Sequence, residues 1–538
     1  MPDSPFSLEK RLFTPADKAD DALPLIFAFP NEYSVGITSL GYQIVWAMLA
    51  QRSDIAVSRL FTDVREPLPT QPALMGFSMS WELDYVNVLN LLAEQQIPIR
   101  AKERTNEHPL VFGGGPVLTA NPEPFALFFD VILLGDGETL LDDFLDAYQR
   151  VKGADRRVQL KALAQVPGVY VPELYVVEYD GADGAITSIQ PIDSDIPATV
   201  KKQTYRGNVL SASTVVTEKA AWENIFMVEV VRSCPEMCRF CLASYLTLPF
   251  RAASVEASLI PAIERGLEKT RRLGLLGASI TQHPEFESLL DYINRPEYDD
   301  VRVSMSSVRT NTVNQKLAET LVKHDSKSIT IAIESGSQRV RDIVNKKLDT
   351  DDIGKAAQAA QAGGLKALKL YGMAGVPGES QDDLSQTAEL MVALKRQVPG
   401  LRLTLGCSTF VPKGHTPFQW YGVNKDAQKR LKFLQKQLRS RGIDFRPESY
   451  SWSVIQALIS RGDRRLAPLL ELTRSYGDTL GSYKRAFKTL KGQLPSLDFY
   501  VHQDWSTEQV LPWEHLEGPL PKSTLAKHLA EAQQAMAA

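Results

Sequence analysis

Residues 1–150 alternate between short apolar runs and stretches, such as residues 41–51, whose apolar side chains recur at helical spacing. The apolar runs have the length of strands: Leu25–Phe29, Ala73–Ser78, Pro109–Pro116 and Val131–Glu138. This alternation, with glycines at the strand ends, predicts a Rossmann-like, doubly wound parallel sheet. The glycines would let a ligand approach the backbone at the carboxyl edge of that sheet.

A second β/α pattern runs through residues 221–424. Its apolar runs are Ile225–Val231, Gly274–Ile280, Val301–Arg309, Ser328–Gln338, Lys366–Tyr371 and Arg402–Phe410. Six such runs predict a partial, TIM-like (β/α)6 barrel. Residues 151–220, with an Asp-Gly turn between strand-like runs, predict a β-rich connector, and residues 425–538 predict a small, mostly helical domain. The basic side chains of residues 426–441 form either a solvated helix face or an RNA or phosphate contact.

Composition narrows the class of protein. A chain of 538 residues is too long for one core, and two to four domains are expected. A net charge of −4 gives no overall reason to expect nucleic acid. No apolar run reaches the length of a membrane span, and the start of the chain lacks a basic and apolar signal region. Four cysteines do not suggest a disulfide framework, so a reducing cytoplasm is expected.

Three of the four cysteines are clustered directly after the apolar run Ile225–Val231. Cys234, Cys238 and Cys241 have C-x3-C-x2-C spacing and would lie at the carboxyl end of a buried barrel strand, where barrel enzymes carry their chemistry. Clustered thiolates select zinc or an iron–sulfur cluster, and a cubane with three protein ligands keeps one iron open. A structural zinc site completed by Cys407 is the alternative.

This spacing, with Phe240 before the third cysteine, resembles the signature of the radical S-adenosylmethionine (radical SAM) superfamily. The resemblance implies a 4Fe–4S cluster on the three cysteines, with S-adenosylmethionine bound at the open iron. It also implies reductive cleavage to a 5′-deoxyadenosyl radical, with electrons from a reductant such as flavodoxin or ferredoxin.

Later strand ends carry further parts of the resemblance. Residues 277–279 stand where the family usually has a Gly-Gly-Glu segment, residues 334–337 are close to its ribose and methionine segment, and residues 372–379 resemble its fifth-strand turn. The implied contacts to S-adenosylmethionine come from Phe240, Gly277, Ser306, Glu334, Ser335, Pro377 and Gly378.

The N-terminal region resembles the cobalamin-binding domain of one large branch of that superfamily. The resemblance lies in residues 29–42, in Phe112–Pro116 and in Gly135–Glu138. The D-x-H-x-x-G motif that supplies an axial histidine is missing, and His108 stands in the wrong context. Two alternatives therefore stay open: the N-terminal region binds cobalamin, or it is a structural or vestigial domain.

The segment Val411–Trp420 resembles the barrel-closing segment of tRNA methylthiotransferases. Those enzymes need a second cluster, for which Cys407 alone is insufficient. Cys407 is either an inert buried thiol or an active-site hydrogen donor or methyl carrier. The expected function is radical-based C–H abstraction or cobalamin-assisted methyl transfer on a small molecule or RNA, and the alternative is a non-catalytic iron–sulfur scaffold or redox sensor.

Overall fold

The computed structural model describes residues 4–537, and its N-terminal unit is a six-stranded sheet in the order β3-β2-β4-β5-β6-β7. Its strands are β2 (Leu23–Ala28), β3 (Ile55–Leu60), β4 (Leu74–Ser78), β5 (Leu110–Gly114), β6 (Val131–Leu133) and β7 (Val169–Tyr170). All pairs are parallel except β6 with β7. The strand order reverses between β2 and β4, which is the position where such sheets bind ligands.

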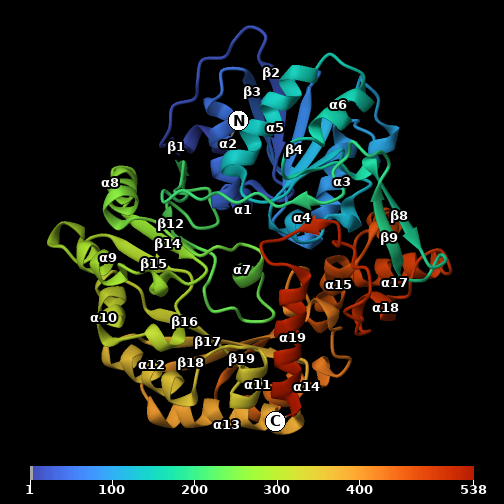
Figure 1. Ribbon diagram of the computed structural model, residues 1–538. Helices are drawn as coiled ribbons and strands as arrows, with labels where there is room; N and C mark the ends of the chain where they lie inside the picture. The colour runs from blue at the N-terminus through green and yellow to red at the C-terminus, as the bar shows by residue number, and fades with distance from the viewer. Residues whose placement is uncertain (1–3, 538) are drawn as a thin grey trace.

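Helices cover both faces of this sheet, as expected for a doubly wound fold (Figure 1). They are α2 (Leu40–Gln51), α3 (Tyr85–Glu94), α4 (Pro116–Ala120) and α5 (Gly137–Val151). Crossovers from β2 to β3 and from β4 to β5 run in opposite directions along the sheet, so right-handed connections place α2 and α3 on opposite faces.

The second unit is the predicted partial barrel. Its parallel strands are β12 (Phe226–Arg232), β14 (Arg272–Gly277), β15 (Arg302–Met305), β16 (Ser328–Glu334), β17 (Ala367–Ala374) and β18 (Arg402–Thr409). They form two four-stranded sheets, completed by β13 (Arg251–Ala252) and β19 (Asp444–Pro447), which meet at a parallel bridge between Val308 and Ile331.

The barrel strands are flanked by helices α8 (Ile260–Leu267), α9 (Phe286–Ile293), α10 (Gln315–Lys323), α11 (Gln338–Ile343), α12 (Thr350–Ala362), α13 (Gln381–Gln397) and α14 (Ala427–Arg439). Alternate strand residues, such as Leu275, Ile331 and Leu405, join the apolar core beneath these helices, so the opposite strand face looks into the barrel. The barrel sheet continues past residue 424, because α14 leads to β19, which pairs in parallel with β18. The sequence did not predict β19, because this short strand is charged and contains no apolar run.

The connector contains the expected hairpin, β8 (Tyr175–Tyr179) with β9 (Ile186–Pro191). The C-terminal region is mainly helical, with α15 (Tyr450–Arg461), α16 (Ala467–Ser475), α17 (Leu480–Thr489), α18 (Leu497–Val501) and α19 (Lys522–Ala537). The last helix, α19, lies along α11 beside the barrel (Figure 1). No helix in residues 4–537 is long and apolar enough to cross a membrane.

Candidate active site

The cysteine loop, residues 233–241, connects β12 to the short helix α7 (Leu242–Tyr245) at the carboxyl end of the barrel. Two of its residues have positive φ angles, Ser233 at 72° and Met237 at 57°, so the loop reverses direction twice. The Met237 carbonyl accepts hydrogen bonds from Asn345 Nδ2 at 2.8 Å and from the Tyr245 hydroxyl at 3.2 Å. These contacts fix the turn between the first two cysteines.

The three loop cysteines are free thiols that lie beside buried charged side chains. Cys238 is 5% exposed, and burial raises its pKa to about 12. Burial also raises the pKa of Cys241, and the nearby Cys234 adds to that effect. These raised pKa values favour the neutral thiol over the thiolate. A bound metal cation would lower them, because it stabilises the thiolate.

Within residues 4–537, no three His, Cys, Asp or Glu side chains converge closely enough to form a ready metal-binding group. The fit to a 4Fe–4S cluster therefore rests on the donor chemistry. Three cysteines on one loop are the number and kind of ligand that such a cluster takes when one iron stays open.

Glu334 ends β16 next to this loop, in a strained conformation with φ of 61°. Its carboxylate accepts a hydrogen bond from Lys346 Nζ at 2.6 Å, and both side chains are buried. Arg309 donates to the Lys346 carbonyl at 2.6 Å and pairs with Glu236 of the cysteine loop at 3.1 Å. This network, which the sequence did not reveal, ties the cysteine loop to the ends of β15 and β16.

Gly277, Pro377 and Gly378 also lie at strand ends on this side of the barrel. A Cβ atom on Gly277 would come within 2.7 Å of the Val231 carbonyl oxygen, so the ends of β12 and β14 pack closely there. Gly378, with φ of 78°, lies under α19, where its Cβ would meet Met536 Cγ at 2.6 Å. The expected S-adenosylmethionine contacts from these residues stay predictions.

The other predicted contact residues differ in their surroundings. Phe240 is half-buried against the larger core, and Ser306 is exposed directly after β15. The buried Ser335 hydroxyl lies 3.2 Å from the Thr387 hydroxyl and accepts a hydrogen bond from the Ser337 backbone N–H. It therefore stabilises the start of α11 in this structure, and a ligand contact from Ser335 stays a prediction.

Cys407 is buried on β18 in the apolar core shared with the barrel helices. Burial raises its pKa well above the ordinary value. The side chain therefore lies on the helix side of the sheet, away from the barrel interior, as expected for the inert thiol alternative.

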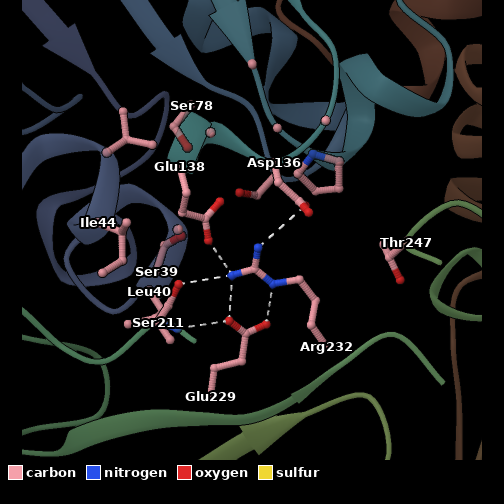
Figure 2. Close-up of a pocket in the computed structure, with 18 of the residues that line it drawn as sticks. Ser39, Leu40, Ile44, Ser78, Asp136, Glu138, Ser211, Glu229, Arg232 and Thr247 are labelled. Carbon is pink, nitrogen blue, oxygen red and sulfur yellow. Dashed lines mark hydrogen bonds and ion pairs between the residues drawn. The ribbon is translucent and has the colours of Figure 1, made fainter. Parts of the chain in front are cut away.

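A cavity of about 510 Å³ separates the N-terminal sheet from the cysteine loop (Figure 2). Its depth is apolar and is lined by Phe27, Ile44, Phe77, Phe112 and Leu140, among others. The strand-end glycines predicted to face a ligand are on its wall, and a Cβ on Gly41 would meet nothing within 4 Å. On the other side the wall includes Ser233 and Gly277, so the cavity reaches the cysteine loop.

An ionic cluster lies in this cavity around Arg232 (Figure 2). The guanidinium forms a bidentate pair with Glu229, with contacts of 2.7 and 2.8 Å, and it bonds Glu138 at 2.6 Å. Asp136 lies 3.5 Å from Arg232 and pairs with Arg251 at 2.6 Å. Burial alone would raise the pKa of Asp136, but the surrounding cations outweigh it and hold that pKa below its usual value.

The cavity combines a mainly apolar wall with a polar edge, which is the kind of lining that small-molecule and cofactor sites have. No histidine is among the residues that line it in the described chain. His108 lies at the amino end of β5, whereas the cavity lies at the carboxyl end. A cobalamin bound here would therefore lack a histidine ligand from His108.

A partial parallel barrel with a three-cysteine loop after its first strand defines the class of this α/β protein. The sequence profile of the radical SAM superfamily matches residues 228–391, and the profile described as radical SAM proteins, N-terminal, matches residues 66–172. The chain belongs to the radical SAM superfamily, and both profiles that match it describe radical SAM proteins. Its cofactors include a 4Fe–4S cluster and S-adenosylmethionine.

Two relatives are similar to this chain in sequence, and one solved structure is similar to it in fold. The uncharacterized protein MJ0966 of Methanocaldococcus jannaschii is 26% identical over 85% of this chain and 93% of its own length. The tRNA-2-methylthio-N(6)-dimethylallyladenosine synthase of Prosthecochloris aestuarii is 23% identical over 47% of this chain and 61% of its own length. The radical SAM methyltransferase TsrM of Kitasatospora setae, with cobalamin and a 4Fe–4S cluster bound, superposes with a TM-score of 0.51 at 12% identity, covering 74% of each chain.

Proposed function

We propose that this radical SAM enzyme carries out cobalamin-assisted methyl transfer, with cobalamin held in the cavity between the N-terminal sheet and the cysteine loop. The observation that carries the proposal is the position of this cavity. Its walls combine the glycine-lined strand ends of β5 and β6 with Ser233 and Gly277 beside the cysteines. TsrM, a methyltransferase with cobalamin bound, shares the fold.

The cluster, when bound, would supply the electron that cleaves one S-adenosylmethionine to methionine and a 5′-deoxyadenosyl radical, and the transferred methyl group would come from a second S-adenosylmethionine, which leaves as S-adenosylhomocysteine. The chain's own residues hold and orient the reactants. Cys234, Cys238 and Cys241 would ligate three irons, and the buried Glu334–Lys346 pair would orient the nucleoside end of S-adenosylmethionine. The apolar depth of the cavity would exclude water from the cobalamin face.

The electrons would come from a flavodoxin or ferredoxin, and the protein would work in the cytoplasm. Its four free cysteines support a reducing compartment. C–H abstraction without methyl transfer is the second candidate function, and a scaffold or redox-sensing role is the third.

The first test replaces a cluster ligand. Cys238→Ala should abolish the electron paramagnetic resonance signal of the reduced cluster and the formation of 5′-deoxyadenosine in anaerobically reconstituted protein. Cys407→Ala, the matched control on β18, should retain both. A wild-type signal that does not shift on addition of S-adenosylmethionine would favour the scaffold or sensor role.

A second test fills the cavity. Ile44→Trp places an indole among the apolar lining, so it should weaken cobalamin binding at least tenfold, measured by the absorbance of cobalamin retained after gel filtration. Val176→Trp, at an exposed position on β8, is the control. Equal retention by both variants would argue against this cofactor site, and 5′-deoxyadenosine without methyl transfer would favour C–H abstraction.

A further inference from the structure

The inner face of the sheet formed by β16, β17, β18 and β19 carries an exposed aromatic side chain. Tyr371, in the middle of β17, is 57% exposed, although strand residues on the other face are buried beneath α12 and α13 (Figure 1). A Cβ atom on Gly406 of β18 would lie 3.0 Å from the Tyr371 ring, so the ring lies over that glycine. Its register partner on β16 is Ala332. Small neighbours on both sides leave one face of the ring free.

Basic side chains surround this ring on the same face. Lys369 lies two residues before Tyr371, Arg402 lies four residues before Gly406, and Arg446 is the register partner of Gly406. Across the barrel, the inner face of β14 and β15 adds the register pair Arg272 and Arg302.

Part of this positive charge is free. Arg446 pairs with Asp444 at 2.9 Å, and Arg302 approaches Asp325 at 3.7 Å. Lys369, Arg402 and Arg272 form no ion pair with any residue in 4–537. A free cationic surface beside an unstacked aromatic ring is the combination that binds single-stranded nucleic acids.

The spacing of the cations favours a strand over a single nucleotide. Arg402 and Arg446 differ by four residues in strand register, which is about 13 Å along the sheet. Successive phosphates of an extended strand can match this spacing. Across the barrel, the exposed hydroxyl of Ser304 on β15 offers a partner for ribose 2′-hydroxyls.

We propose that this inner face is the docking surface for single-stranded RNA, with one base stacked on Tyr371 and phosphates contacting Lys369, Arg402 and Arg446. The inference rests on the proposed function, because it names the substrate class of the same barrel. Tyr371 precedes Gly372, the register partner of Glu334, so the stacked base would lie beside the expected S-adenosylmethionine site.

The test is fluorescence anisotropy of a labelled single-stranded 12-nucleotide RNA against the full-length, cluster-loaded protein without reductant. Because no turnover is involved, binding is measured independently of S-adenosylmethionine cleavage and of cobalamin. Tyr371→Ala should weaken binding by about 5- to 150-fold, the range for loss of one stacked base, with little change in salt dependence. Tyr371→Phe should retain binding, which separates stacking from a folding defect.

The phosphate contacts predict a different signature. Lys369→Gln and Arg402→Gln should each lower the slope of log affinity against log salt by about 0.7. The control is Lys432→Gln with Lys436→Gln on α14, outside the barrel, which should leave binding unchanged. Absence of RNA binding, loss in the α14 control instead, or equal binding of a DNA strand of the same sequence would overturn the proposal.

Discussion

At the residue scale, the buried and half-buried carboxylates of this protein differ in whether a cation accompanies them. Glu334 forms an ion pair with Lys346 at 2.6 Å, and Glu379 forms one with Arg430 at 2.7 Å. Asp84, in the loop after β4, has only the Asn31 amide at 3.1 Å and forms no ion pair with residues 4–537. Burial, together with the nearby Glu82, raises the pKa of Asp84 to about 6.

Asp84→Asn should therefore stabilise the protein at neutral pH. The folded state holds the Asp84 proton more tightly than the unfolded state, whose pKa is 3.8, so ionisation costs stability as the pH rises from about 4 to above 6. A shift of this size is worth about 3 kcal/mol, and partial solvent exposure reduces it to about 1–2 kcal/mol. Asparagine does not ionise, and it keeps a side-chain oxygen that can accept the Asn31 hydrogen bond.

The measurement is urea denaturation of the variant and the wild type at pH 4 and pH 7.5. The variant's gain in the free energy of unfolding should be near zero at pH 4 and reach its full value at pH 7.5. Asp183→Asn, on the exposed hairpin turn, should show no such pH-dependent gain. A gain for Asp84→Asn that is the same at both pH values would contradict the expectation.

At the scale of elements, the sequence was informative where the signal is local. The strand–helix alternation, the cysteine loop after β12 and the glycine-rich ends of β5 and β6 are each contained in one short segment. Contacts between distant segments were not predictable. Lys346 meets Glu334 only because α11 returns the chain to the barrel end, and the Ser335 hydroxyl is bonded to a residue 52 positions later.

The C-terminal helix α19 is another element whose position the sequence did not indicate. Glu531 pairs with Arg239 of the cysteine loop at 3.1 Å, and His528 lies 2.9 Å from the Tyr245 hydroxyl. Near its end, Met536 packs on Gly378. The helix therefore contacts both the cysteine loop and the turn to which the resemblance assigns an S-adenosylmethionine contact.

Removal of α19 after Pro521 should weaken S-adenosylmethionine binding at least tenfold, because the Gly378 turn and the cysteine loop lose their shared support. Isothermal titration calorimetry on the cluster-loaded protein measures this, with circular dichroism as the check on folding. Glu531→Gln should give a smaller effect in the same direction, and Lys527→Gln, an exposed position on the same helix, should give none. Unchanged affinity after truncation would show that α19 only covers the barrel.

At the scale of the whole molecule, the N-terminal sheet and the barrel meet at the cavity through charged side chains. Arg232 belongs to the barrel, and it bonds Glu138 of the N-terminal unit as well as Glu229 of its own strand. Arg251, also on the barrel side, pairs with Asp136 of the N-terminal unit across the same joint. The cluster holds the Rossmann-like sheet and the cysteine loop in one arrangement, which a cofactor between them requires.

Arg232→Met should loosen this joint, because it leaves Glu138 and Glu229 close together without their shared cation. Removing one partner of a buried ion pair costs about 3–5 kcal/mol, and the loss here should be smaller because these side chains are half-buried. The expected result is a lower thermal midpoint and faster proteolysis of the connector, residues 151–220. Combining Arg232→Met with Glu138→Gln should recover part of the loss, since the remaining repulsion is smaller. If the single and double variants unfold at the same temperature, repulsion between Glu138 and Glu229 does not destabilise the joint. The joint then depends on the apolar contacts around the cavity.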